Sequence, residues 1–180
     1  MSFAPERLHQ TVLAIAGELR HDPGLAAEML RAERQFFGGL PDYAPEGPAR
    51  ASAQARFAEW FVLERESEHL GAVPIEAFGG ISEPVRDALR ATACGLFLVE
   101  SVEPELRVRD VLRGEAFELE TDATLRVGDV VVGRVYPGAT DAVAPSPAAA
   151  ILRDGGAVVA ALQRDLRRAG IERQLTQAEI

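Results

Sequence analysis

The chain has 180 residues, a length that suits one domain with a sizeable core and excludes an assembly of three domains. Apolar residues make up 47% of it and charged residues 26%, which is typical of a globular protein and excludes the disordered and fibrous classes. Acidic residues outnumber basic ones by 28 to 19, and the resulting net charge of −9 opposes binding to a nucleic-acid backbone.

The sequence predicts neither a membrane span nor a secretory leader. No apolar run approaches the roughly 18 residues that a spanning helix requires, and Glu6 and Arg7 lie where a leader would need its apolar stretch. The single cysteine, Cys94, has apolar neighbours, which indicates a small buried side chain and leaves no intrachain disulfide. We therefore expect a cytoplasmic protein without a membrane partner.

The N-terminal part is predicted to begin with two amphipathic helices. Residues 5–20 and 25–37 both carry apolar side chains at helical spacing, and we expect the two helices to pack as a hairpin. Glycines and prolines are frequent in residues 38–48, which indicates a connector.

Three more helical segments follow the connector. Residues 52–70 are predicted to form a long helix with an aromatic cluster around Trp60, for which both core packing and a partner-binding face are considered. Residues 74–78 indicate a single turn, and Pro84 opens a short helix that extends to about Cys94.

From Gly95 onward the pattern changes to β-structure. The strands are expected from alternating apolar and polar residues over 96–102, 106–112, 116–121 and 130–136, with a fifth over 141–144. Their short spacing predicts an antiparallel meander that curls into a small barrel or half-barrel.

The last part is predicted to return to helix, over 147–152 and over 156–170. Residues 176–179 have the form of a capping box, Thr-x-x-Glu, at the start of a helix. This pattern is explained equally by a native chain that continues beyond Ile180 and by a chance match.

We assign the whole chain, residues 1–180, to a single α+β domain. Its helical part covers residues 1–94, its β part, a small curved antiparallel sheet or half-barrel of four to five strands, covers 95–145, and a C-terminal helical part covers 146–180.

Several motifs in the middle of the chain carry a resemblance. The segments Arg56-Phe57-Ala58-Glu59-Trp60-Phe61 and Pro74-Ile75-Glu76-Ala77-Phe78, with the strand series at 109–115 and 128–135, resemble a group of uncharacterised bacterial proteins, some of which carry a SEC-C type zinc motif. The resemblance covers roughly residues 55–137 and implies no activity. A chain with one cysteine cannot supply the cysteine-rich zinc ligands, so zinc is not expected.

Each histidine has a glutamate three residues before it, an arrangement that carboxylate-bridged metal bundles use when the pairs point inward. The pairs are Glu6 with His9, Glu18 with His21, and Glu66 with His69. The amphipathic pattern places them at the surface instead, so no metal ligand and no cofactor is predicted.

No catalytic residue is predicted either, because the serines lack a nucleophile elbow and the glycine pairs lack a phosphate-loop ending. In the strand series, Arg109, Asp110 and Arg134 interrupt apolar runs. One interpretation is an arginine-carboxylate pair on the exposed face of the sheet. The other is that Arg109 and Arg134 donate bidentate hydrogen bonds to an acidic partner or a phosphate. The candidate binding residues are therefore Trp60, Arg109, Asp110 and Arg134.

By exclusion, the sequence favours a non-catalytic, protein-binding adaptor or regulatory domain. Its expected partner is another protein, with a homodimer included. A nucleic-acid-associated small barrel is the first alternative, disfavoured by the acidic charge, and a metal-dependent enzyme using the Glu/His pairs is the second.

Overall fold

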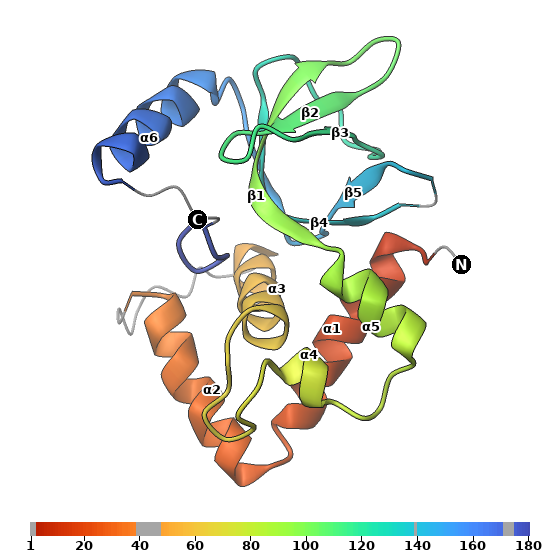
Figure 1. Ribbon diagram of the computed structural model, residues 1–180, viewed down its shortest axis with the longest axis vertical. Coiled ribbons are helices and arrows are strands. Elements are labelled where there is room, and N and C mark those ends of the chain that lie inside the picture. Colours follow the sequence, from red (N-terminus) through yellow and green to blue (C-terminus); the bar gives the residue numbers. More distant parts are fainter. Residues whose placement is uncertain (1–2, 39–47, 139, 171–174) are drawn as a thin grey trace.

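The protein is an α+β structure in which the N-terminal helices pack at one side of a curled antiparallel half-barrel and the C-terminal helix lies beside the sheet, away from them (Figure 1). The computed structural model describes residues 3–38, 48–138, 140–170 and 175–180. The helices among them are α1 (Pro5–Leu19), α2 (Pro23–Phe36), α3 (Pro48–Leu63), α4 (Pro74–Ala77), α5 (Glu83–Arg90) and α6 (Gly156–Arg168).

Helix starts follow local chemistry. Proline stands in the first turn of α1, α2, α4 and α5, where its missing N–H costs nothing. Asp22 additionally caps α2, because its carboxylate accepts a hydrogen bond from the Leu25 N–H at 2.9 Å.

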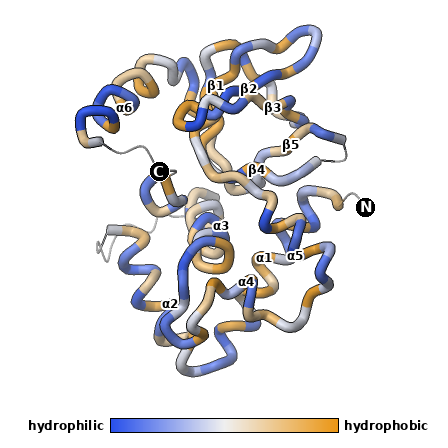
Figure 2. The backbone as a smooth tube through the Cα atoms, viewed as in Figure 1, coloured by the Kyte–Doolittle hydropathy of each residue, from blue (hydrophilic) through white to orange (hydrophobic). Residues whose placement is uncertain are grey.

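The helical core forms around α3, which packs against both α1 and α2. The first two helices diverge from the turn that joins them, so the predicted hairpin opens into a V (Figure 1). Hydrophobic and hydrophilic stretches alternate along these helices, as amphipathic packing requires (Figure 2). The apolar side chains at the centre of this core include Leu8, Val12, Ile15, Phe57 and Phe61.

The strands of the sheet are β1 (Ala93–Ser101), β2 (Arg107–Asp110), β3 (Ala116–Glu118), β4 (Val130–Pro137), β5 (Val143–Pro145) and β6 (Ala150–Leu152). The order is β3-β2-β1-β4-β5, and β6 also pairs with β4. A parallel bridge between Leu119 and Val143 links the ends of the outer strands β3 and β5. Together these pairings curl the five strands β3-β2-β1-β4-β5 into a half-barrel.

Several elements differ from the sequence prediction. The long helix predicted over 52–70 ends at Leu63, and the residues that follow it form turns and an isolated bridge between Ser67 and Ala72. β1 begins at Ala93, inside the part expected to be helical. The helix predicted over 147–152 is wrong, because Ala150–Leu152 pair with Val130–Val132 of β4 as strand β6. An alanine-rich run favours helix in isolation, but pairing with an available strand overrides that preference.

One face of the central strands meets two different partners. Val130 of β4 and Leu96 of β1 pack against Val159 of α6. Further along the same face of β4, Tyr136 belongs to the helical core. Arg134 lies between these two contacts, so β4 brings polar side chains to the junction of helices and sheet.

Residues 176–179 form a turn rather than a helix. Glu179 accepts hydrogen bonds from the Thr176 N–H at 2.9 Å and from its hydroxyl at 3.0 Å, so the side-chain contact of a capping box is present. Among the described residues, no helix combines the length and the apolar character needed to cross a membrane.

Candidate functional site

The junction between the helices and the half-barrel contains a fully buried carboxylate, Glu59 of α3. Its Oε1 accepts hydrogen bonds from the Tyr136 hydroxyl at 2.9 Å and the Ser146 hydroxyl at 2.5 Å, and lies 3.0 Å from Nδ1 of His9. Its Oε2 accepts from the Gln177 amide at 2.7 Å. One side chain therefore joins α1, α3, β4, the segment after β5 and the C-terminal turn.

These contacts keep Glu59 ionised inside the protein. Burial is the largest influence on its pKa and would raise it, but the donated hydrogen bonds and the positive charge of Arg134 outweigh burial. The pKa of Glu59 is therefore lowered. Burial raises the pKa of Tyr136, as does the neighbouring negative charge, so its hydroxyl remains a donor.

A second buried pair lies next to this carboxylate. Arg134 is 3% exposed, and its guanidinium donates to the Glu64 carboxylate and, at 2.7 Å, to the Thr92 hydroxyl. Glu64 also accepts from the Gln177 N–H at 2.9 Å. Burial raises the pKa of Glu64 despite the adjacent guanidinium, and the negative charge of Glu59 raises it further.

The Ser146, His9 and Glu59 side chains meet, but their arrangement is not that of a nucleophilic triad. In a triad, one imidazole nitrogen contacts the hydroxyl and the other contacts the carboxylate. Here Nδ1 of His9 faces both groups, at 3.5 Å from Ser146 and 3.0 Å from Glu59, and the serine hydroxyl donates directly to the carboxylate. The network therefore stabilises the junction and offers no activated nucleophile.

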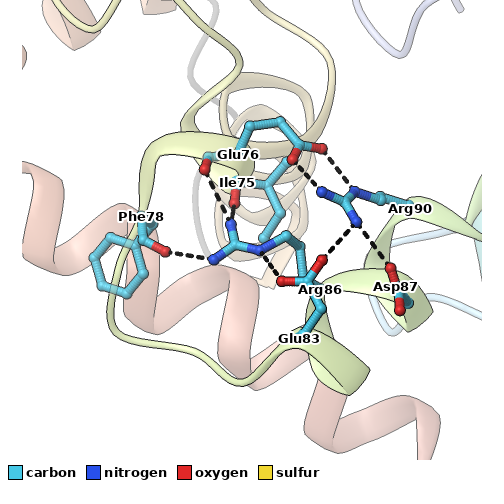
Figure 3. A network of polar contacts seen from close by, with 7 residues as sticks. All are labelled: Ile75, Glu76, Phe78, Glu83, Arg86, Asp87 and Arg90. Carbon is cyan, nitrogen blue, oxygen red and sulfur yellow. Dashed lines mark hydrogen bonds and ion pairs between the residues drawn. The ribbon is translucent and has the colours of Figure 1, made fainter.

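A pocket of about 400 Å³ opens beside the Arg134–Glu64 pair. Its rim includes Glu76 and Arg90, which belong to a network that ties α4 to α5 (Figure 3). In this network Arg90 donates to Glu76, Glu83 and Asp87. The pocket thus has a salt-bridged rim and a buried arginine in its wall.

A larger groove of about 720 Å³ runs between α1, α2 and α3. Leu30 of α2 lines it and is 62% exposed. Small side chains make up much of the remaining wall: Ala16, Gly17, Ala26, Ala51, Ala55 and Ala58.

Comparisons with known proteins give no relative for this chain. No protein-family model matches it, and neither the curated proteins nor the solved structures contain a match.

The structure separates the four predicted binding residues. Trp60 is only 6% exposed and packs against Phe36 and Phe57, so it offers no surface to a partner. Asp110 is buried and caps the turn after β2 by accepting from the Leu112 N–H at 2.8 Å.

The two arginines have different environments. Arg109 is exposed and forms a bidentate pair with Glu100 at 2.6 and 3.1 Å, as the interpretation of an exposed arginine-carboxylate pair states. The predicted position of Arg134 on the same exposed face is wrong, because its side chain is buried and donates to Thr92 and to the carboxylate of Glu64, its counter-charge.

One of the three histidines contacts the glutamate that stands three residues before it, and the other two face different carboxylates. His9 is buried against Glu59, so its predicted surface position is wrong. His21 contacts Glu18 at 3.3 Å in solvent, whereas His69 lies 3.6 Å from Asp22. In the part of the chain that the structure describes, no three His, Cys, Asp or Glu side chains gather in a way that could hold a metal ion.

Proposed function

We propose that the protein is a non-catalytic, protein-binding adaptor or regulatory domain that docks a helix of its partner in the groove between α1, α2 and α3. The observation that carries this proposal is the groove itself. It combines a wall of small side chains with Leu30, a large apolar side chain left mostly in solvent.

The spacing of the lining residues fits a helical partner. On each of the three helices they recur at intervals of three and four residues, as in Leu13, Ala16, Gly17 and Arg20 of α1. Such stripes run along the helix axes and form a channel. Alanine and glycine allow a close approach, and an amphipathic helix lays its apolar face into a channel of this kind.

Charges at the rim indicate what flanks the apolar face of that partner helix. Arg20 and Arg50 line the groove, are exposed, and have no ion-pair partner among the described residues. Glu33, the acidic residue of the lining, is hydrogen-bonded to Gln54 at 2.6 Å. A helix with acidic residues beside its apolar face therefore complements the groove, although the chain as a whole is acidic.

The nucleic-acid alternative gains less support. OB-type barrels bind single strands on the face of strands two and three, with exposed aromatic rings as stacking platforms. On β2 of this half-barrel, Arg107 is paired with Glu105 at 2.9 Å and Arg109 with Glu100. The one aromatic side chain of β2 and β3, Phe117, is partly buried against Phe97.

Two matched variants test the groove. Leu30→Glu places a charge in it, and Val127→Glu makes the same change at a side chain with a similar exposure of 60%, outside the groove. Neither substitution removes core packing, so both variants should fold with wild-type stability.

Proteins that co-purify from cells that naturally make the chain are then quantified for both variants and for Arg20→Glu. The proposal expects a partner that Leu30→Glu and Arg20→Glu lose and that Val127→Glu retains. Light scattering on the purified chain shows whether the occupant is a second copy. A partner set unaffected by Leu30→Glu, together with unchanged self-association, would overturn the proposal.

A further inference from the structure

A cleft of about 460 Å³ lies at the half-barrel, and nothing above assigns it a ligand. Its walls come from the start of α1, the segment after β3, strand β4, and the segment from β5 to β6. We call it the barrel cleft and define it by six of its lining residues: Glu6, Glu120, Asp122, Leu125, Val131 and Ile151. None of these residues lines the groove between α1, α2 and α3, so the barrel cleft is a separate surface.

The apolar interior of the half-barrel reaches the barrel cleft. Leu125 and Val131 line the cleft and belong to the hydrophobic cluster to which the five strands β1 to β5 contribute. Val131 pairs directly with Ile151 of β6, and residues opposite each other in an antiparallel pair lie on the same face of the sheet. Ile151 therefore lies on the interior face as well, yet it is 37% exposed, whereas Val131 is 1% exposed. The interior is thus open to solvent beside β6.

The barrel cleft lies in a gap between two points at which the half-barrel closes. At one end of the gap, Leu119 forms its bridge with Val143. At the other end Arg153, directly after β6, donates to the Thr124 carbonyl at 2.8 Å. Between these contacts, residues 121–123 and β6 both contribute to the lining, and no backbone hydrogen bond joins them among the described residues. The outer edge of β6 therefore borders the cleft.

This outer edge of β6 has no partner strand in the described part of the chain. There β6 pairs with β4 alone, and its residues Ala150, Ile151 and Leu152 are all exposed. Every second residue of an antiparallel strand directs its N–H and C=O groups away from the partner strand. Unpaired groups of this kind can bind an extended peptide as an added strand.

Every charged side chain in the lining of the barrel cleft is a carboxylate: Glu6, Glu120 and Asp122. All three are exposed, and none forms an ion pair with another described residue. The Thr140 hydroxyl donates to Glu120 at 3.0 Å, but it brings no positive charge. The negative charge of the cleft is therefore uncompensated.

Arginines elsewhere in this part of the chain do not supply the missing charge. Arg126 and Arg153 line another pocket together with Asp129 and Asp154, so two carboxylates match them. Arg7 follows Glu6 in α1 but is not part of the lining. A basic occupant is therefore attracted to the cleft, and the net charge of −9 adds attraction at long range.

We propose that the barrel cleft binds an extended, basic segment of a partner protein, which pairs with the outer edge of β6 as an added strand. Apolar side chains at every second position of the segment cover Leu125, Val131 and Ile151. Its lysine or arginine side chains pair with the exposed carboxylates, and the segment closes the half-barrel. This occupant differs in chemistry from the acidic helix proposed for the groove between α1, α2 and α3.

Three heptapeptides test the proposal on the full chain. In the first, lysine and valine alternate; in the second, glutamate replaces each lysine; the third is the first with N-methyl groups on its three central amides, which keeps the charges and removes donors of the added strand. The first peptide should bind at least tenfold more tightly than either of the others. It should shift the amide signals of Leu125, Val131 and Ile151, and slow hydrogen exchange in β6.

Two charge-reversal variants separate the cleft from the charge of the whole chain. Asp122→Lys and Glu66→Lys change the net charge equally, and both replace an exposed carboxylate without an ion-pair partner among the described residues. Asp122→Lys should weaken binding of the lysine–valine peptide about fivefold, because it replaces an ion pair at the surface with a repulsion. Glu66→Lys, outside the cleft, should bind as the wild type does.

Results with the wild-type chain alone can overturn the proposal, whether or not Asp122→Lys folds. Equal binding of the glutamate peptide contradicts the basic occupant, and equal binding of the N-methylated peptide contradicts the added strand. A lysine–valine peptide that leaves the cleft signals unchanged contradicts both. If these signals change with the concentration of the chain alone, the occupant is a second copy and the proposal is wrong.

Discussion

Replacing Glu59 tests how much the buried carboxylate contributes to joining helices and sheet. Glu59→Ala removes the acceptor of hydrogen bonds from His9, Tyr136, Ser146 and Gln177. With about 1 kcal/mol net for each contact, the expected loss of unfolding free energy is about 4 kcal/mol. A chain of this length should then unfold about 10 °C lower.

Glu59→Gln is the matched control, because it changes the charge and keeps the shape. Its Oε1 can still accept from the Tyr136 and Ser146 hydroxyls. Its amide can donate to Oε1 of Gln177, a buried atom without a partner among the described residues, once the Gln177 amide turns over. We therefore expect a smaller loss, of about 1–2 kcal/mol.

The contribution of Glu59 to the stability of the fold should depend on pH in a defined direction. The pKa of Glu59 is lowered from the usual 4.5, so its charged form stabilises the fold above about pH 4.5, and this contribution is lost as the pH falls through the lower, folded-state pKa. The difference in stability between wild type and Glu59→Gln should therefore shrink below pH 4.5.

Urea unfolding measures both effects, because the single tryptophan, Trp60, is buried next to Glu59 and its emission reports the transition. Circular dichroism provides a second probe that does not depend on this neighbourhood. A Glu59→Ala variant within about 1 kcal/mol of wild type would show that the buried carboxylate does not hold the junction together. A Glu59→Gln difference that is constant with pH would contradict its lowered pKa.

Three further predictions concern single residues. Burial raises the pKa of Cys94 to about 12. At pH 8 its thiol should therefore react with a thiol reagent about a thousandfold more slowly in the folded chain than in urea. Comparable rates in the two states would contradict its burial. Gly133 has φ of +133°, and a Cβ there would lie 3.3 Å from Cα of Ala149. Gly133→Ala should therefore lower the free energy of unfolding in urea by about 1–3 kcal/mol. Gly79→Ala is the control and should be nearly neutral, because open space surrounds that position. Arg134→Met should lower the free energy of unfolding by about 3 kcal/mol or more, because it leaves Glu64 buried without its counter-charge. Arg109→Ala, at an exposed ion pair, should lower it by under about 1 kcal/mol. Equal losses for the two variants would contradict the difference in burial.

Much of the fold could be predicted because local patterns determine it. Helical spacing gives α1 and α2, because each buries one face, and alternation gives β2, whose exposed and buried residues alternate. β1 and β4 are buried on both faces over most of their length, and short apolar runs between turn residues mark them in the sequence. The stretch 150–152 could not be read in this way. Its conformation depends on β4, which lies about 20 residues earlier in the chain.

The junction site was beyond local patterns for the same reason. Glu59 and Gln177 are 118 residues apart, and no spacing rule connects them. One signal was present: Glu59 stands among Phe57, Trp60 and Phe61, and a carboxylate within an aromatic cluster has to find buried donors. Arg134 stands in an otherwise apolar strand and therefore also has to find a buried partner. Its partner Glu64 is 70 residues away, so the sequence does not identify it.

The docking groove can be tested most directly by photo-cross-linking in living cells. A photoreactive amino acid is placed at Leu30, inside the groove, or at Val127, which has a similar exposure elsewhere on the surface. Position 30 should cross-link one partner protein, through a helical segment with acidic residues beside its apolar face, and position 127 should not. Cross-linking from position 30 that does not exceed the yield from position 127 would show that the groove is not a docking site.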